Sequence, residues 1–257
     1  LKPFLFAQAL DLGLNTATIL EDIERTYASP RGIYSPVNFN RKSYGPVSMR
    51  NALGNSLNQT AVSLLNTIGY SSFYETLRSL DLINFPQRGP EHYGLGMVIG
   101  NPEVTLVQLA SAYASLARGG LFLPAKYFIN DKSQKGKRVF SEEASYIITD
   151  MLSDSSARTL TFGDFFNQKL PFKVALKTGT STNFRDGWIV GYTPKYTVAI
   201  WVGNFNGQPT GGLSGAQAAG PILVDILNEL YPNGFSSSFP RPDRVISTEV
   251  CSHSGMR

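Results

Sequence analysis

The chain has 257 residues, of which 42% are hydrophobic and 16% charged, so it is long enough to bury a large core in one domain or two small ones. Its net charge of +4 comes from scattered lysines and arginines, a pattern typical of a solvated surface that argues against nucleic-acid binding. No stretch approaches the roughly 20 apolar residues of a membrane helix, and the start lacks the regions of a signal peptide. We therefore expect any export signal or membrane anchor to lie in a segment upstream of this sequence.

The cysteine and the two histidines exclude several kinds of chemistry. Cys251 is the single cysteine, so it cannot form an internal disulfide. His92 and His253 are far apart in the sequence, and their neighbours complete no metal-ligand set. With so few histidines, a Ser/His/Asp triad is not expected either. The composition predicts neither a metal site nor a cofactor.

The first part of the chain is predicted to be helical, with one long loop. Apolar residues at positions 4–14 suit a buried helix that starts at or before the first residue, so Lys2 is expected in its first turn. Residues 24–47 are rich in Pro, Gly, Ser, Tyr and Asn without periodicity, which predicts a surface loop. Ser48 is a candidate cap for a short helix that Gly54 ends.

Three further helices have recognisable start signals. One is predicted directly after Ser56 and Asn58, which places these two residues in the loop between two helices. Thr105 and Gln108 have the spacing of a capping box, and Ser141 is a cap followed by acidic residues. The apolar faces of the three helices are predicted to contain Ala61, Leu64 and Leu65; Leu106, Leu109, Ala110, Tyr113, Leu116 and Ala117; and Ile147, Ile148, Met151 and Leu152.

Three strands are predicted next, at residues 172–178, 187–192 and 196–202, and their short connections make them antiparallel neighbours. Pro221 is predicted to be the first residue of a final helix that covers this sheet. Helices followed by a sheet and a closing helix indicate an α+β fold, an antiparallel sheet flanked by helices. The sheet-facing side of the final helix is predicted to contain Ile222, Leu223, Ile226, Leu227 and Leu230.

The tail has the composition of a linker. From Pro232 onward it contains a run of serines at positions 236–238, then Pro240 and Pro242. We expect one domain over residues 1–231, and a linker with the start of a C-terminal module over residues 232–257.

The residues from Lys177 to Thr180 are suited to binding a peptide. The two-residue period of a strand puts Lys177 and Gly179 on one face, and Thr178 and Thr180 on the other. Gly179 lets a ligand backbone approach closely, and an edge strand offers open backbone groups to an added peptide strand. The hydroxyls of Thr178 and Thr180 are available to a carboxylate.

Ser56 and Asn58 can point to the same side of an irregular turn. The Ser56 hydroxyl can then pass a proton while the Asn58 amide holds a peptide bond of a substrate. The same two residues also suit an ordinary helix cap beside a turn, so from these residues alone both interpretations stay open.

The order of these motifs and their flanks resembles the transpeptidase domain of class A penicillin-binding proteins. The resemblance covers residues 1 to about 231, and the tail segment Cys251-Ser252-x-Ser254-Gly255 is similar to the region after this domain in proteins of the 1C type. The matching segments are Lys2-Pro3-Phe4, Tyr34-Ser35-Pro36, Gly45-Pro46-Val47-Ser48, Arg50-x-Ala52-Leu53-x-x-Ser56-Leu57-Asn58, Lys177-Thr178-Gly179-Thr180-Ser181, Arg185-Asp186-x-Trp188-x-Val190-Gly191-Tyr192-Thr193-Pro194 and Trp201-Val202-Gly203.

The resemblance implies a Ser-x-x-Lys motif that ends at Lys2, with the nucleophilic serine just upstream of Leu1. A neutral lysine one helical turn after a serine can take its proton, so Lys2 is the candidate base. With Lys177 about 5 Å away at an effective dielectric near 20, repulsion would lower the pKa of Lys2 by about two units, and desolvation would add to this. The resemblance also implies that the Thr180 N–H and the N–H of the nucleophile form the oxyanion hole.

The resemblance further implies a β-lactamase/transpeptidase-like fold and a D,D-transpeptidase that cross-links peptidoglycan stem peptides through a serine acyl-enzyme. Such an enzyme would be trapped by β-lactam antibiotics, and would work in the periplasm or on the extracytoplasmic face of the bacterial inner membrane. No cofactor, metal or nucleic acid is implied. The expected catalytic residues are Lys2, Ser56, Asn58 and Lys177, and the expected substrate-binding residues are Thr178, Gly179 and Thr180.

Two rival hypotheses stay open. The first is a hydrolase of the same superfamily, either a D,D-carboxypeptidase or a β-lactamase. No glutamate between Asn58 and Lys177 has an asparagine four residues on, which argues against the β-lactamase but leaves the carboxypeptidase. The second is a non-catalytic module that holds cell-wall peptide.

Overall fold

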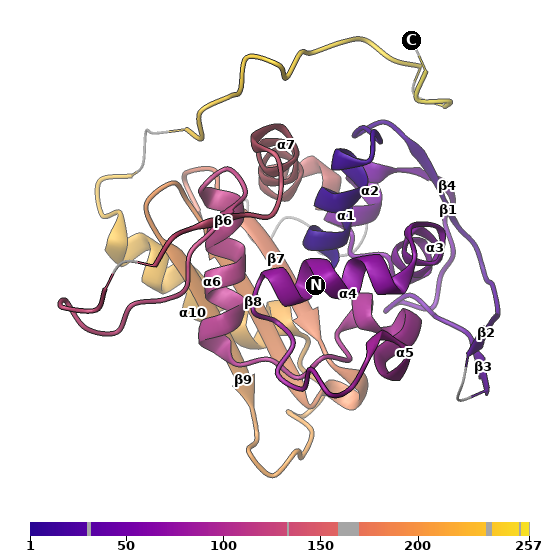
Figure 1. Cartoon of the computed structure of the whole chain (residues 1–257), viewed down its shortest axis with the longest axis horizontal. Helices are drawn as coiled ribbons and strands as arrows, with labels where there is room; N and C mark the ends of the chain where they lie inside the picture. The colour runs from indigo at the N-terminus through magenta and orange to yellow at the C-terminus, as the bar shows by residue number, and fades with distance from the viewer. Residues whose placement is uncertain (30–31, 133, 159–169, 235–237, 252, 257) are drawn as a thin grey trace.

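The main sheet of the protein has three antiparallel strands (Figure 1). The computed structural model describes residues 1–257 except 30–31, 133, 159–169, 235–237, 252 and 257. Neighbouring strands pair as predicted, and their register places Lys177 opposite Val190. In their order across the sheet, the strands are β7 (Ala175–Thr180), β8 (Asp186–Tyr192) and β9 (Thr197–Gly203).

Helices cover both faces of this sheet, which confirms the predicted α+β architecture. Helix α10 (Gly215–Leu230) packs on one face, and helices α6 (Leu106–Ala117) and α7 (Glu142–Ser153) pack on the other. The alternation of a strand explains this division, because Ala175 packs with the helical core while Leu176 packs with α10. In the described part of the chain, no helix has both the length and the hydropathy needed to span a membrane.

Helix α1 (Lys2–Asp11) is buried in the helical half of the protein. Its residues are apolar around most of the circumference, and Phe4, Leu5 and Phe6 are fully buried. The first turn carries Lys2, as predicted, and tolerates Pro3 because the first N–H groups of a helix have no intrahelical partner. The helical half also contains α2 (Met49–Gly54), α3 (Asn58–Ile68), α4 (Tyr70–Ser79), α5 (Pro90–Tyr93) and the 3-10 helix η1 (Gly94–Ile99).

Residues 19–48 form two small antiparallel pairs, so the prediction of an irregular loop over residues 24–47 was wrong in part. These strands have only three or four residues each, and one pairing joins Ile19 to Ser48. Such short strands with distant partners leave little periodic signal in the local sequence. The pairs are β1 (Ile19–Asp22) with β4 (Gly45–Ser48), β2 (Tyr27–Ser29) with β3 (Gly32–Tyr34) and, further on, β5 (Leu121–Phe122) with β6 (Lys137–Arg138).

Side-chain caps confirm three predicted helix starts. Ser48 and Ser141 each accept a hydrogen bond from the backbone N–H three residues further on. Thr105 and Gln108 form the predicted capping box at the start of α6. The predicted apolar face of α6 is wrong at Leu106, which is exposed because it lies in the first turn, away from the core.

The final helix and the first strand start at other residues than predicted. Helix α10 begins at Gly215, because Ser214 and Gln217 form a capping box upstream of Pro221, which lies inside the helix. Strand β7 begins at Ala175 rather than at residue 172. On α10 the predicted sheet-facing side is correct at the buried Leu223 and Leu227, and wrong at the exposed Ile222, Ile226 and Leu230.

The tail after α10 has no helix or strand in its described residues, yet it contacts the rest of the protein. The rings of Phe239 and Tyr192 pack with their centroids 5.8 Å apart. Further on, Gly255 lies so close to the carbonyl oxygen of Ala17 that a side chain would not fit. Figure 1 shows the tail returning past α7 toward the N-terminal helices. The domain boundary near residue 231 stays a prediction.

Candidate active site

The turn between α2 and α3 holds Ser56 in a strained backbone conformation. Its φ of 58° lies in the left-handed region, which costs a residue other than glycine on the order of 1 kcal/mol. Two backbone hydrogen bonds fix the turn, from the Ser56 N–H to the Leu53 carbonyl at 3.1 Å and from the Leu57 N–H to the Ala52 carbonyl at 3.0 Å. Strain of this kind is often found at functional positions.

Two lysine side chains reach Ser56 from different parts of the fold. Nζ of Lys177, on β7, donates to Ser56 Oγ at 2.8 Å, and Nζ of Lys2, at the start of α1, donates to it at 3.3 Å. Lys2 Nζ also donates to Asn58 Oδ1 at 2.8 Å. The structure therefore brings together the four side chains that the sequence predicted to be catalytic, although they come from three distant segments.

Burial lowers the proton affinity of both lysines. Lys2 is 8% exposed and Lys177 is 7% exposed, and neither forms an ion pair with a carboxylate in the described ranges. Desolvation lowers the pKa of Lys2 from 10.5 to about 8. The pKa of Lys177 lies well below its usual value, first through desolvation and then through the charges of Lys2 and Arg158. For Lys2, the sequence predicted repulsion by Lys177 with desolvation adding to it, whereas in the structure desolvation is the cause of the lowered pKa.

A buried network that no sequence motif marked holds Asn58 in place. The Asn58 N–H donates to Asn38 Oδ1 at 2.7 Å, and Asn58 Nδ2 donates to the Val37 carbonyl at 2.8 Å. Asn38 is fixed in turn by Asp22, whose carboxylate oxygens accept from Asn38 Nδ2 at 3.0 and 2.8 Å. Asn58 therefore turns Oδ1 toward Lys2 and keeps one N–H of Nδ2 for a ligand.

Strand β7 has the open edge that the peptide-binding interpretation requires. Among the described strands it pairs with β8 alone, so the backbone groups of its other edge remain available. Thr180 Oγ1 accepts a hydrogen bond from the Gly215 N–H at 2.8 Å, which leaves its hydroxyl hydrogen for a carboxylate. The carbonyl of Thr178 accepts from Lys177 Nζ at 2.8 Å. A side chain at Gly179 would lie 3.3 Å from Trp188 Cβ, so glycine suits this position.

Arg158 is a third cation near the two lysines, and no sequence motif marked it. It is buried at the end of the 3-10 helix η2 (Ser156–Arg158), and its charge contributes to the lowered pKa of Lys177. This turn is tied to the Ser56 turn, because Asn55 Nδ2 donates to the Ala157 carbonyl at 2.7 Å. Nothing in the local sequence pattern indicates this contact between distant turns.

The histidines lie elsewhere on the protein. His92 is at the end of α5 and His253 is in the tail, and both are exposed. The described residues contain no group of three His, Cys, Asp or Glu side chains that could hold a metal ion.

Comparison with known sequences agrees with this geometry. The family model for the penicillin binding protein transpeptidase domain matches residues 1–228. Penicillin-binding protein 1C of Escherichia coli strain K12 is 32% identical over 255 residues, which are 98% of this chain and 32% of that protein. Penicillin-binding protein 1A/1B of Bacillus subtilis strain 168 is 29% identical over 258 residues, covering 90% of this chain and 27% of that protein.

Solved structures show the same fold. Penicillin-binding protein 1A from Haemophilus influenzae has a TM-score of 0.85 at 20% identity, covering 99% of this chain and 45% of that chain. PonA1 from Mycobacterium tuberculosis, solved in complex with penicillin V, has a TM-score of 0.78 at 22% identity, covering 95% of this chain and 71% of that chain.

The chain belongs to the penicillin-binding protein transpeptidase family. This confirms the family and the β-lactamase/transpeptidase-like fold expected from the motifs. The chain spans about a third of the length of the curated relatives that it matches.

Proposed function

We propose that this domain is a D,D-transpeptidase that cross-links peptidoglycan stem peptides through a serine acyl-enzyme. The observation that carries the proposal is the convergence of Lys2, Lys177 and Asn58 around Ser56, beside the open edge of β7. Membership of the transpeptidase family supports it. The proposed nucleophile is a serine one helical turn before Lys2, on the same helix face.

In the first half-reaction, Lys2 is the proposed base. Its neutral form takes the proton of the nucleophilic serine as that Oγ adds to the carbonyl carbon of the D-Ala-D-Ala peptide bond. A pKa of about 8 leaves roughly a tenth of Lys2 neutral at pH 7. The C–N bond then breaks, and the proton passes from Lys2 through the Ser56 hydroxyl to the amine of the departing D-alanine. The acyl group remains on the serine as an ester.

In the second half-reaction, an amine of a neighbouring stem peptide attacks the ester carbonyl. The amine gives its proton to Ser56 and Lys2, which return it to the serine oxygen as the C–O bond breaks. The product is a new peptide bond, and the free serine is restored. A β-lactam would acylate the same serine by ring opening and remain attached.

Residues of β7 and the Asn58 turn are proposed to hold the substrate. The Thr180 N–H and the N–H of the nucleophile would form the oxyanion hole, whose donors are worth roughly 3 kcal/mol each in the transition state. The remaining N–H of Asn58 would hold a substrate carbonyl, and the hydroxyls of Thr178 and Thr180 would bind the terminal carboxylate. Gly179 would let the peptide backbone approach the strand.

The proposed substrate sets the location and the partners. Stem peptides and β-lactams meet the enzyme in the periplasm, on the extracytoplasmic face of the bacterial inner membrane. We propose that an upstream segment of the full-length protein supplies the anchor, and that residues 232–257 lead into a further module.

A two-product assay on the full-length protein tests this function. With a stem pentapeptide as donor and an amine-bearing stem peptide as acceptor, we expect D-alanine release together with cross-linked product, both measured by mass spectrometry. Release of D-alanine without cross-linked product would indicate a carboxypeptidase. Stoichiometric peptide binding without either product would indicate a binding module.

Labelling with fluorescent penicillin tests the assignment of the nucleophile. We expect a covalent adduct on the full-length protein and none on the 257-residue chain alone. A stable adduct on the shorter chain would show that the nucleophile lies within these residues.

A further inference from the structure

Arg158 places an unsatisfied polar group inside the protein. Its side chain is largely buried, and in the part of the chain that the structure describes its Nη1 atom has no hydrogen-bond partner. Removing a guanidinium group from water without an acceptor is unfavourable, and this desolvation lowers the pKa of Arg158. An anion beside Nη1 would compensate for the lost hydration.

The carboxylate whose charge acts on Arg158, that of Asp154, is already engaged. Its Oδ2 forms an ion pair with Arg50 Nη1 at 3.0 Å. Its Oδ1 accepts from the N–H groups of Ser156 at 3.0 Å and Ala157 at 3.2 Å. Asp154 therefore fixes the turn that carries Arg158 rather than satisfying the guanidinium group.

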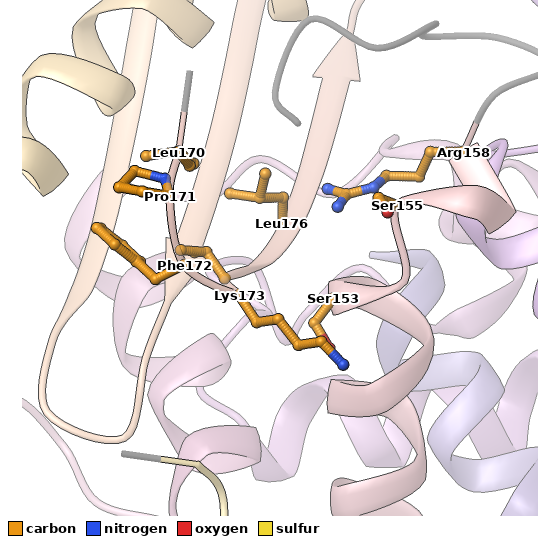
Figure 2. A pocket seen from close by; sticks show the side chains of 9 residues that line it. Ser153, Ser155, Arg158, Leu170, Pro171, Phe172, Lys173 and Leu176 are labelled. Atoms are coloured by element: carbon orange, nitrogen blue, oxygen red, sulfur yellow. The ribbon is translucent and has the colours of Figure 1, made fainter. Parts of the chain in front are cut away.

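A cavity of about 240 Å³ lies in front of the guanidinium group. Figure 2 shows Arg158 pointing into it toward Leu176, with Phe172 on the far side. Ser155 adds a hydroxyl group to its wall and Lys173 adds a second cation, while the Ser153 hydroxyl, also on the wall, donates to the Asp150 carbonyl at 3.1 Å. The volume equals that of about eight liquid waters, enough for a carboxylate with a short aliphatic group.

The cavity adjoins the candidate active site along β7. Leu176 lines the cavity, and the next residue, Lys177, reaches Ser56 Oγ. Arg158 lies close enough to Lys177 for its charge to act on that lysine. A peptide that pairs with the open edge of β7 beside Lys177 would therefore pass near the mouth of the cavity.

We propose that this cavity is an anion site in which Arg158 binds a carboxylate of the peptide that lies along β7. The inference rests on the proposed transpeptidase function and deepens it, because it adds a carboxylate contact to those of Thr178 and Thr180.

Binding would also act on the catalytic lysine. The charges of Lys2 and Arg158 both contribute to the lowered pKa of Lys177. Because a bound anion would offset the charge of Arg158, the pKa of Lys177 would rise. Among the residues that the structure describes, Asp154 at the end of α7 and Lys173 on the cavity wall are further charged groups near Arg158, and Arg50 pairs with Asp154.

Thermal unfolding of the full-length protein in the presence of Nα-acetyl-D-alanine tests the site. At constant ionic strength we expect this carboxylate to raise Tm by roughly 2–4 °C near saturation, and its neutral amide to leave Tm unchanged. In Arg158→Met the affinity should fall at least about tenfold, because the charge-assisted hydrogen bonds are lost. Arg78→Met, which removes an exposed arginine paired with Glu75, is the matched control and should bind as the wild type does.

Several results would overturn the proposal. One is that the wild type and Arg158→Met bind Nα-acetyl-D-alanine with equal affinity. Another is that Nα-acetyl-D-alanine and its neutral amide raise the Tm of the wild type equally, a comparison that needs no variant. Tighter binding of inorganic phosphate than of Nα-acetyl-D-alanine would make this a site for free anions.

The proposed function is tested separately from this site. Thr178→Val should weaken binding in the groove yet keep the stabilisation that depends on Arg158. Penicillin labelling of the wild-type protein reports acylation whether or not Arg158 binds a carboxylate. Either proposal can therefore fail while the other holds.

Discussion

Two buried polar clusters of the helical half differ in how well their charges are matched. Around the fully buried Asp22, the carboxylate accepts hydrogen bonds from Asn38 Nδ2, from the Tyr44 N–H at 2.9 Å and from Thr60 Oγ1 at 3.0 Å. Around Ser56, two lysines share one hydroxyl, with no carboxylate among their described partners. Lys2 also donates to Asn58 Oδ1, and Lys177 to the Thr178 carbonyl. The first cluster is saturated and fixes structure, whereas the second leaves positive charge unmatched. Burying a lysine without a carboxylate partner lowers its pKa, which makes the neutral amine available as a base but destabilises the folded protein.

The largest expected effect is the loss of the proposed base. Lys2→Met should slow acylation of the full-length protein by penicillin roughly 10²–10⁴-fold, because no neutral amine remains to take the serine proton. Stopped-flow or gel-based labelling measures the rate. Lys195→Met, at an exposed lysine of the β8–β9 turn, is the matched control and should acylate at the wild-type rate. Equal rates for the two variants would remove Lys2 from the mechanism.

A substitution in the saturated cluster around Asp22 should instead lower the stability of the protein. Asn38→Ala deprives Asp22 of two hydrogen bonds and the start of α3 of its acceptor, which should lower the free energy of unfolding by about 3 kcal/mol. Urea denaturation measures the loss. Asn40→Ala, two residues on and exposed, should cost less than about 1 kcal/mol. Similar losses in both variants would mean that the Asp22 network is not the main support of the Asn58 turn.

The unmatched cluster should make stability depend on pH. Folded Lys2 releases its proton near a pKa of about 8, while the unfolded chain keeps it up to 10.5. Between these values the unfolded state binds more protons, so the free energy of unfolding should rise with pH, by roughly 3 kcal/mol over the window. The lowered pKa of Lys177 acts in the same direction.

Urea denaturation between pH 7.5 and 10.5 measures this slope. Lys2→Met should have a smaller slope than Lys195→Met, since it lacks one of the two titrating groups. Equal slopes for these variants would show that Lys2 keeps an ordinary pKa in the folded protein.

The smallest effect concerns the strained turn. Ser56→Gly should be more stable than Ser56→Ala by roughly 1 kcal/mol, because glycine adopts the left-handed φ of 58° without a steric penalty. Both variants lose the hydroxyl, so both should acylate more slowly than the wild type. Differential scanning calorimetry measures the difference between them. A Ser56→Ala variant as stable as Ser56→Gly would show that the turn stores no backbone strain.

Short sequence patterns predicted the helices and strands whose formation depends on residues close together in the chain. The capping box at Thr105 and Gln108 defines α6 within one turn of chain, and the sheet follows from alternation and short connections. The pairing of Ile19 with Ser48 and the Asp22–Asn38 contacts join distant segments of irregular sequence. For the site, motif order predicted Lys2, Ser56, Asn58 and Lys177. Arg158 could not be predicted, because its role depends on a cavity and on a charge that acts through space.

The position of the acyl group tests the central claim most directly. After the full-length protein reacts with penicillin, proteolysis and tandem mass spectrometry locate the modified residue. Lys2 and Lys177 both donate to the Ser56 hydroxyl, which we interpret as a proton relay. We therefore expect the adduct on the serine one helical turn before Lys2, with Ser56 unmodified. An adduct on Ser56 itself would contradict the account, since Ser56 would then be the nucleophile and not the relay.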